Sequence, residues 1–116
     1  MKTIEELSRK VVEFRDARDW AQFHNPKDSA ISLLLEATEV LEHFQWKNKQ
    51  EVEEYLLDHK DDVGEELADV LYWVLLMSND LGIDLSDAFE KKLKQSGEKY
   101  PIEKAKGNHK KYSELK

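Results

Sequence analysis

Two stretches of the sequence repeat one pattern of acids and apolar residues, Glu36-Ala37-Thr38-Glu39-Val40-Leu41 and Glu66-Leu67-Ala68-Asp69-Val70-Leu71. This repeat is the strongest indication of the fold. In each stretch two acids stand three residues apart, and Val and Leu follow the second acid. Side chains at positions i and i+3 share one face of an α-helix, so each stretch predicts a largely apolar helix with a thin acidic stripe. No run of alternating β-branched residues competes with this interpretation. The expected fold class is therefore all-α, with the helices packed as a bundle of the four-helix type.

Capping residues and helix breakers predict the extent of the helices. A Thr-x-x-Glu capping box opens the first helix, and Pro26 interrupts the chain before Asp28 or Ser29, either of which can cap the second. Gly82 is expected to end the third helix. Four helices are thus predicted, over residues 3–18, 29–44, 62–79 and 84–95, with a loop carrying a short helix over residues 48–61 and an irregular tail from about residue 97.

The composition limits the class of protein. A chain of 116 residues suits one domain, residues 1–116, that would gain considerable burial by self-association. The absence of Cys excludes disulfides and thiolate metal ligands, and the N-terminal residues lack the apolar stretch of a signal peptide. The longest uncharged run near the middle, residues 70–79, is far shorter than the roughly 20 apolar residues needed to cross a bilayer. We therefore expect a cytoplasmic protein without a membrane partner.

Charge is unevenly distributed along the chain. Residues 1–90 hold 9 Lys and Arg against 22 Asp and Glu, whereas residues 91–116 hold 9 Lys against 3 Glu. The resulting net charges of −13 and +6 make the body acidic and the tail basic. An acidic body lacks the basic face that nucleic acids require, so no nucleic-acid partner is expected. A charged small molecule bound together with a metal ion is compatible with this distribution.

The four acids Glu36, Glu39, Glu66 and Asp69 are candidate metal ligands. None of them has a Lys or Arg three or four residues away, and their charged neighbours at that spacing are other acids. Like charges so placed destabilise a helix, so a cation from elsewhere is expected. Clustered carboxylates without His or Cys suit Mg²⁺, or Mn²⁺ in its place, better than Zn²⁺. The alternative is that both stripes simply face water, as acidic helix faces commonly do.

Further segments resemble those of one family. The matching segments are Arg18-Asp19-Trp20-Ala21-Gln22-Phe23-His24-Asn25-Pro26, Phe44-Gln45-Trp46-Lys47, Tyr100-Pro101 and Lys111-Tyr112-Ser113-Glu114-Leu115. They resemble the RDWxQFHxP, FQWK, YP and KYTEL segments of the dCTP pyrophosphatase branch of the MazG-like nucleotide pyrophosphohydrolases. That superfamily also carries ExxE followed by a later ExxD, as in the two stretches above. The resemblance spans nearly the whole chain in order, with one departure at Ser96, where many relatives carry Asn.

The resemblance implies an enzyme, a nucleoside triphosphate pyrophosphohydrolase (diphosphatase). Its substrate would be a (deoxy)nucleoside triphosphate, with dCTP or a modified dCTP favoured, and its products the monophosphate and pyrophosphate. It also implies Mg²⁺ bound by Glu36, Glu39, Glu66 and Asp69, and assembly as a homotetramer or homodimer. Clustered divalent ions can neutralise phosphate charge and supply an activated water. Glu39 or Glu36 could orient or deprotonate that water, and the sequence leaves the choice open.

Aromatic and basic residues are candidates for substrate binding. By periodicity alone the three Trp residues are ordinary core or subunit contacts, and His24 and His43 are hydrogen-bonded structural residues. The resemblance instead implies a pyrimidine pocket in which aromatic rings stack on the base. The Lys-rich tail is either a solvated end or a segment that folds over the triphosphate. The candidates are Trp20, His24, Trp46, Trp73, Lys92, Tyr100, Lys104, Lys111 and Tyr112.

Two other functions compete with hydrolysis. A non-catalytic helical binding or scaffold module could use the acidic stripes to contact a basic partner protein. Release of pyrophosphate from nucleotides would distinguish the enzyme from such a module. A ferritin-like metal-carboxylate bundle is disfavoured because neither stripe contains the Glu-x-x-His pattern of those sites.

Overall fold

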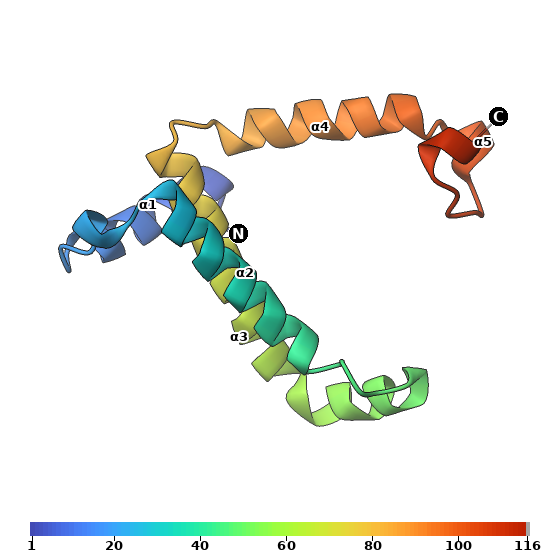
Figure 1. Cartoon of the computed structure of the whole chain (residues 1–116), viewed down its shortest axis with the longest axis horizontal. Helices are drawn as coiled ribbons and strands as arrows, with labels where there is room; N and C mark the ends of the chain where they lie inside the picture. Colours follow the sequence, from blue (N-terminus) through green and yellow to red (C-terminus); the bar gives the residue numbers. More distant parts are fainter. Residues whose placement is uncertain (116) are drawn as a thin grey trace. The chain divides into compact units, whose positions relative to one another are not determined.

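The computed structural model describes residues 1–115, which form helices and turns without a β-strand (Figure 1). The chain divides into two compact units, residues 1–83 and a second unit that begins at Asp84. The elements are α1 (Ile4–Asp16), η1 (Ala21–Phe23), α2 (Pro26–Glu42) and α3 (Lys49–Asp80) in the first unit, then α4 (Leu85–Lys99), α5 (Ile102–Ala105) and η2 (Tyr112–Glu114). The all-α prediction is confirmed, and the four-helix arrangement stays a prediction.

Helices α1 and α2 begin at side-chain caps. The Thr3 hydroxyl accepts the backbone N–H of Glu6 at 3.1 Å, as the capping box predicts. The predicted cap of α2 is wrong, since the helix begins earlier and Asn25 accepts the backbone N–H of Asp28 at 2.9 Å. Pro26 occupies the first turn of α2, where its missing N–H would have no intrahelical partner in any case. The proline therefore opens the helix and does not merely separate it from the preceding segment.

Helix α3 is continuous over 32 residues, so the loop predicted over residues 48–61 is wrong. Asn48 and Glu51 form a reciprocal capping box, with backbone N–H to side-chain distances of 2.9 and 3.2 Å. The residues that follow are mostly strong helix formers, and here their propensity outweighs weak apolar periodicity. The predicted C-terminal signal is confirmed, because Gly82 has a φ of 66° and the Ile83 N–H bonds the Ser78 carbonyl at 2.8 Å.

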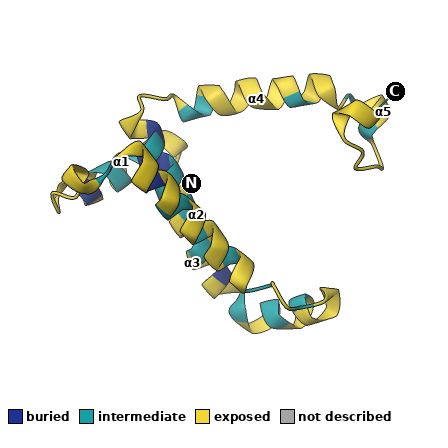
Figure 2. Cartoon of the chain, viewed as in Figure 1, coloured by how far each residue is buried: buried dark blue, intermediate teal, exposed yellow. Residues whose placement is uncertain are grey.

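The first unit is organised around α3, which packs against both α1 and α2. Its buried apolar residues are Val63, Leu75 and Leu76, all on α3 (Figure 2). Arg15 is also buried, and its Nη1 atom donates to the two Asp80 carboxylate oxygens at 2.7 and 2.6 Å. This ion pair links α1 to the last turn of α3.

Much apolar surface on α2 and α3 stays exposed in the single chain. The exposed apolar side chains on the two helices are Ile31, Leu34, Leu35, Leu41, Leu57, Leu67 and Leu71. A patch of this kind commonly marks a surface that another protein covers.

The second unit contains more helix than the sequence analysis predicts. Asp84 caps α4 by accepting the Asp87 N–H at 3.0 Å, and the helix continues through Gly97 to Lys99. A glycine inside a helix costs only about 1 kcal/mol, which this helix tolerates. In the tail, the Tyr112 N–H donates to the Tyr100 hydroxyl at 3.1 Å, and α5 and η2 give order to the segment. Across the described residues, no helix combines the length and the apolar character needed to span a membrane.

Candidate metal centre and its adjoining pocket

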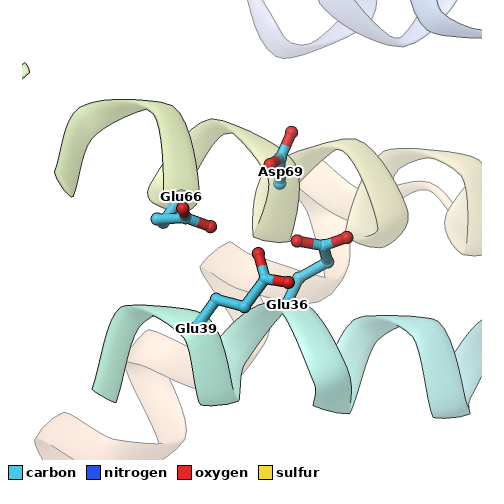
Figure 3. Close-up of side chains that lie close together, drawn as sticks. All are labelled: Glu36, Glu39, Glu66 and Asp69. Atoms are coloured by element: carbon cyan, nitrogen blue, oxygen red, sulfur yellow. The ribbon is translucent and has the colours of Figure 1, made fainter. Parts of the chain in front are cut away.

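The four acids of the repeated pattern meet between α2 and α3. Glu36, Glu39, Glu66 and Asp69 each offer one carboxylate oxygen, and these oxygens lie within 4.8 Å of one another. Figure 3 shows the pair from α2 facing the pair from α3 across the gap between the helices. The spacing of three residues puts each pair on one helix face, and the packing of α2 on α3 brings the two faces together. We call these four residues the carboxylate cluster.

The carboxylate cluster has an enclosed pair and an open pair. Glu36 and Glu66, the first acid of each repeat, are half-buried, whereas Glu39 and Asp69 are exposed. The Oε2 atoms of Glu36 and Glu66 are buried and have no hydrogen-bond partner among the described residues. No Lys or Arg in residues 1–115 forms an ion pair with the cluster. Buried carboxylate oxygens without a partner are costly, and the four acids lie close enough together that they could hold a cation.

Contacts within the cluster and burial raise the pKa values of its enclosed acids. The pKa of Glu66 rises from 4.5 to about 7, through its hydrogen bond with Glu39, then burial, and then the charges of the other three acids. The pKa of Glu36 is raised by burial first and by the charge of Glu39 second. A raised pKa favours the protonated form of each acid, so a proton and a cation would compete for the enclosed carboxylates.

A cavity of about 420 Å³ joins the carboxylate cluster to a group of aromatic side chains. Its lining residues are Phe14, Trp20, His24, Glu36, Asp69, Tyr72 and Trp73. Trp73 meets the rings of His24 and Tyr72 edge to face, at centroid distances of 5.2 and 5.3 Å. Phe14 meets Trp20 in the same way at 5.8 Å. The cavity therefore has aromatic walls and an acidic edge, a combination that suits a ligand with a planar ring and a metal-bound anionic group.

The turn after α1 and the turn of α3 that follows Asp69 supply these aromatic walls. Asp19 adopts a left-handed conformation with a φ of 55°, and the next residue, Trp20, donates its N–H to the Arg15 carbonyl at 3.2 Å. Sequence analysis missed Phe14 and Tyr72. Tyr72 stands three residues after Asp69, so its position on the cluster's face was available from helix periodicity. Phe14 carries no comparable local signal, because tertiary packing of α1 on α3 brings it to the cavity.

The structure gathers only some of the predicted substrate-binding residues. Trp20, His24 and Trp73 line the cavity, whereas Trp46 lies in the turn after α2, is 86% exposed and does not line it. The others belong to the second unit and stay predictions, namely Lys92, Tyr100, Lys104, Lys111 and Tyr112. The metal-binding and catalytic roles of the carboxylate cluster are likewise predictions that the geometry makes reasonable.

Known proteins resemble this chain in sequence and in fold. Residues 31–115 match the MazG-like family. The dCTP pyrophosphatase 1 proteins of mouse and human are each 33% identical over 115 residues, which is 97% of this chain and 68% of theirs. The crystal structure of a pyrophosphatase from Archaeoglobus fulgidus superposes with a TM-score of 0.80 at 38% identity, over 87% of this chain and 94% of that chain. The chain belongs to the MazG-like family.

Proposed function

We propose that this protein is a nucleoside triphosphate pyrophosphohydrolase that uses Mg²⁺ and acts on dCTP or a modified dCTP, giving the monophosphate and pyrophosphate. The observation that carries the proposal is the cavity that places Glu36 and Asp69 beside a set of aromatic rings. The reaction class follows from membership of the MazG-like family and from similarity to proteins named dCTP pyrophosphatase 1 and pyrophosphatase. The names of the first group favour dCTP.

The carboxylate cluster fits a hard divalent cation. Mg²⁺ prefers oxygen ligands in octahedral geometry and keeps several waters, and Mn²⁺ can replace it in such sites. The cluster offers four carboxylates, of which Glu36 and Glu66 each hold a buried oxygen without a partner. When bound, the metal would neutralise charge on the phosphates and make a water more acidic. Glu36, Glu39, Glu66 and Asp69 are the residues that would hold it.

The difference in burial between the two pairs of acids suggests that they have different roles in the reaction. The enclosed acids Glu36 and Glu66 are suited to holding the cation, because burial limits their movement and leaves them without another partner. Glu39 is exposed, so a water beside it can also reach a phosphate group of the substrate. We assign to Glu39 the role of orienting this water and accepting its proton, with Glu36 as the alternative.

The aromatic part of the cavity would bind the base. Stacking of a base on an aromatic side chain contributes about 1 to 3 kcal/mol. Trp20, Tyr72 and Trp73 provide the rings, and His24 adds a buried Nδ1 atom that has no partner among the described residues. This atom can exchange a hydrogen bond with the edge of a pyrimidine. Trp46, Lys92, Tyr100, Lys104, Lys111 and Tyr112 are proposed to contact the base or the triphosphate in the assembled enzyme.

Self-association would cover the exposed apolar faces of the first unit. Ile31, Leu34, Leu35 and Leu41 on α2 are 46%, 66%, 58% and 54% exposed, which is unusual for so many apolar side chains on one helix. We propose that further copies of this chain cover them, in a homotetramer or homodimer. Light scattering of the purified protein tests this, and a monomer at micromolar concentration would contradict it.

Incubation with a panel of dNTPs and Mg²⁺, followed by separation of the products, tests the activity. We expect pyrophosphate and a monophosphate from dCTP, and no turnover by Glu39→Gln or Asp69→Asn while helix content stays unchanged. Glu42→Gln is the matched control, because Glu42 is an exposed acid on the same helix outside the carboxylate cluster. If no nucleotide released pyrophosphate, the protein would instead fit a non-catalytic helical binding module that uses its acidic stripes.

A further inference from the structure

A group of side chains at the junction of α2 and α3 contacts the carboxylate cluster from outside the cavity. His43, the C-cap residue that follows α2, places its Nε2 atom 3.9 Å from Oε1 of Glu66. Its other ring nitrogen, Nδ1, lies 2.5 Å from the hydroxyl oxygen of Tyr55 on α3. Neither His43 nor Tyr55 lines the aromatic cavity. Any effect of this pair on a reaction in that cavity would therefore pass through Glu66.

We infer that His43, held by Tyr55, is a positioning residue that fixes the carboxylate of Glu66 for metal binding. The inference rests on the proposed function, since it concerns the cation that the carboxylate cluster would hold. An ionised carboxylate only accepts hydrogen bonds, so Nε2–H is the group of His43 that would attract Oε1 of Glu66; at 3.9 Å the contact is electrostatic and longer than a hydrogen bond. Nδ1 then accepts a hydrogen bond from the hydroxyl of Tyr55. In this arrangement Tyr55 fixes both the tautomer and the orientation of the imidazole.

The two oxygens of Glu66 have different surroundings. Oε1 faces His43, while Oε2 is buried and has no partner among residues 1–115. The contact with His43 at one oxygen would limit rotation of the carboxylate, and the other oxygen would stay available to an ion. Partners of this kind orient metal ligands in many sites, and their removal costs about 10 to 100-fold in metal affinity or activity.

Tyr55 is itself fixed by three further contacts. His59 stacks on it with a centroid distance of 4.1 Å and an angle of 6° between the rings, and His59 Nδ1 lies 3.0 Å from the Tyr55 carbonyl oxygen. The Lys47 ammonium lies 4.3 Å from the centre of the Tyr55 ring and donates to the His43 carbonyl at 2.8 Å. The end of α2 and the first part of α3 thus hold the His43–Tyr55 pair in one place.

The decisive experiment measures Mg²⁺ binding to the full chain by calorimetry, together with Mg²⁺ activation of dCTP hydrolysis. His43→Ala should raise both the Mg²⁺ dissociation constant and the half-activating Mg²⁺ concentration about 10 to 100-fold. At saturating Mg²⁺, the KM for dCTP should stay within about two-fold of the wild-type value. His43→Gln should recover part of the affinity, because its amide N–H can replace the Nε2–H. His109→Ala is the control, since His109 is exposed in the second unit.

Tyr55→Phe separates positioning from simple structural support. It should raise the Mg²⁺ dissociation constant by a smaller factor, and its effect should vanish when added to His43→Ala, because the hydroxyl acts only through His43. An unchanged Mg²⁺ dissociation constant in a folded His43→Ala variant, or a loss of kcat that saturating Mg²⁺ does not restore, would overturn the inference. If His43→Ala does not fold, the same criteria apply to His43→Gln and Tyr55→Phe. A wild-type protein that binds Mg²⁺ but hydrolyses no nucleotide would instead refute the proposed function.

Discussion

Breaking the ion pair between Arg15 and Asp80 should destabilise the protein and disturb the aromatic cavity together. The Arg15 side chain is 6% exposed and that of Asp80 is 31% exposed, with Nη1 2.7 and 2.6 Å from the two carboxylate oxygens. The hydrogen bond with Asp80 is also the main cause that raises the pKa of Arg15. Asp80→Asn removes the opposing charge and one of the two acceptor oxygens, and it leaves the 3.2 Å contact with Asp16 as the remaining ion pair of the buried guanidinium.

The expected cost lies between the values for surface and buried ion pairs. Removing one partner costs about 3 to 5 kcal/mol in a fully buried pair and about 0 to 1 kcal/mol in an exposed one. Because the new amide oxygen can still accept an N–H of Arg15 and the charge of Asp16 remains, we expect a loss of about 2 kcal/mol. For a chain of this size that corresponds to a fall of about 8 °C in the melting temperature. The KM for dCTP should rise as well, since Arg15 adjoins Phe14 and binds the Trp20 N–H through its carbonyl.

Thermal unfolding followed by circular dichroism at 222 nm measures the effect. The matched control is Asp87→Asn, which removes the same charge from the ion pair with Lys91, at 2.9 Å but with side chains that are 55% and 77% exposed. The control should lose less than about 1 kcal/mol. Equal melting temperatures for the two variants would show that the buried contact adds nothing beyond an exposed one, and the reasoning would fail.

Three other predictions concern the cluster, the backbone and the cavity. The folded pKa of Glu66, about 7, exceeds its ordinary 4.5, so the stability that this group contributes to the metal-free protein is present below pH 4.5 and is lost as pH rises through about 7. Melting curves should show this decline, and it should be absent in Glu66→Gln and reversed by Mg²⁺. Gly64→Ala, inside α3 with no atom within 4 Å of the added Cβ, should stabilise the protein by about 0.5 to 1 kcal/mol. Gly82→Ala should destabilise it by about 1 to 2 kcal/mol, because φ at this position is +66°, although the space around the added Cβ is equally open. Urea titration measures the free energy of unfolding of both variants. Trp73→Ala should raise the KM for dCTP about 5- to 150-fold, as expected from losing about 1 to 3 kcal/mol of stacking. A smaller increase than that of Trp46→Ala would contradict the assigned base pocket.

The carboxylate cluster could be predicted because the pairing of its acids depends on their spacing along each helix. Three-residue spacing fixes which side chains share a helix face, and the repeat at Glu36 and Glu66 indicated that two such faces exist. That the faces meet within 4.8 Å depends on how α2 packs on α3, which spacing alone does not determine. The unequal burial of the two acids in each pair has the same tertiary origin.

The features that the sequence analysis missed depend on contacts between distant residues or on weak local signals. Phe14 reaches the cavity through the packing of α1, to which the Arg15–Asp80 contact across the chain contributes. Residues 49–61 contain few apolar positions, so periodicity favoured a loop although charged helix formers dominate the segment. As a consequence the contacts of Tyr55 with His43 and His59 were also missed. His43 alone, without its partner, gave no sign of a role beyond structure.

Because α3 is continuous, a change in the number of residues between Tyr55 and Glu66 would move one of these side chains relative to the other. These two residues stand about three helical turns apart on one continuous helix, and His43 contacts both. Deleting or inserting one residue between them would rotate Tyr55 by about 100° around the helix axis. Adding two whole turns, about seven residues, would restore the direction but carry Tyr55 about 10 Å along the axis and out of reach of His43. The segment can therefore exchange its side chains widely, but it has no loop in which to absorb a gain or loss of residues.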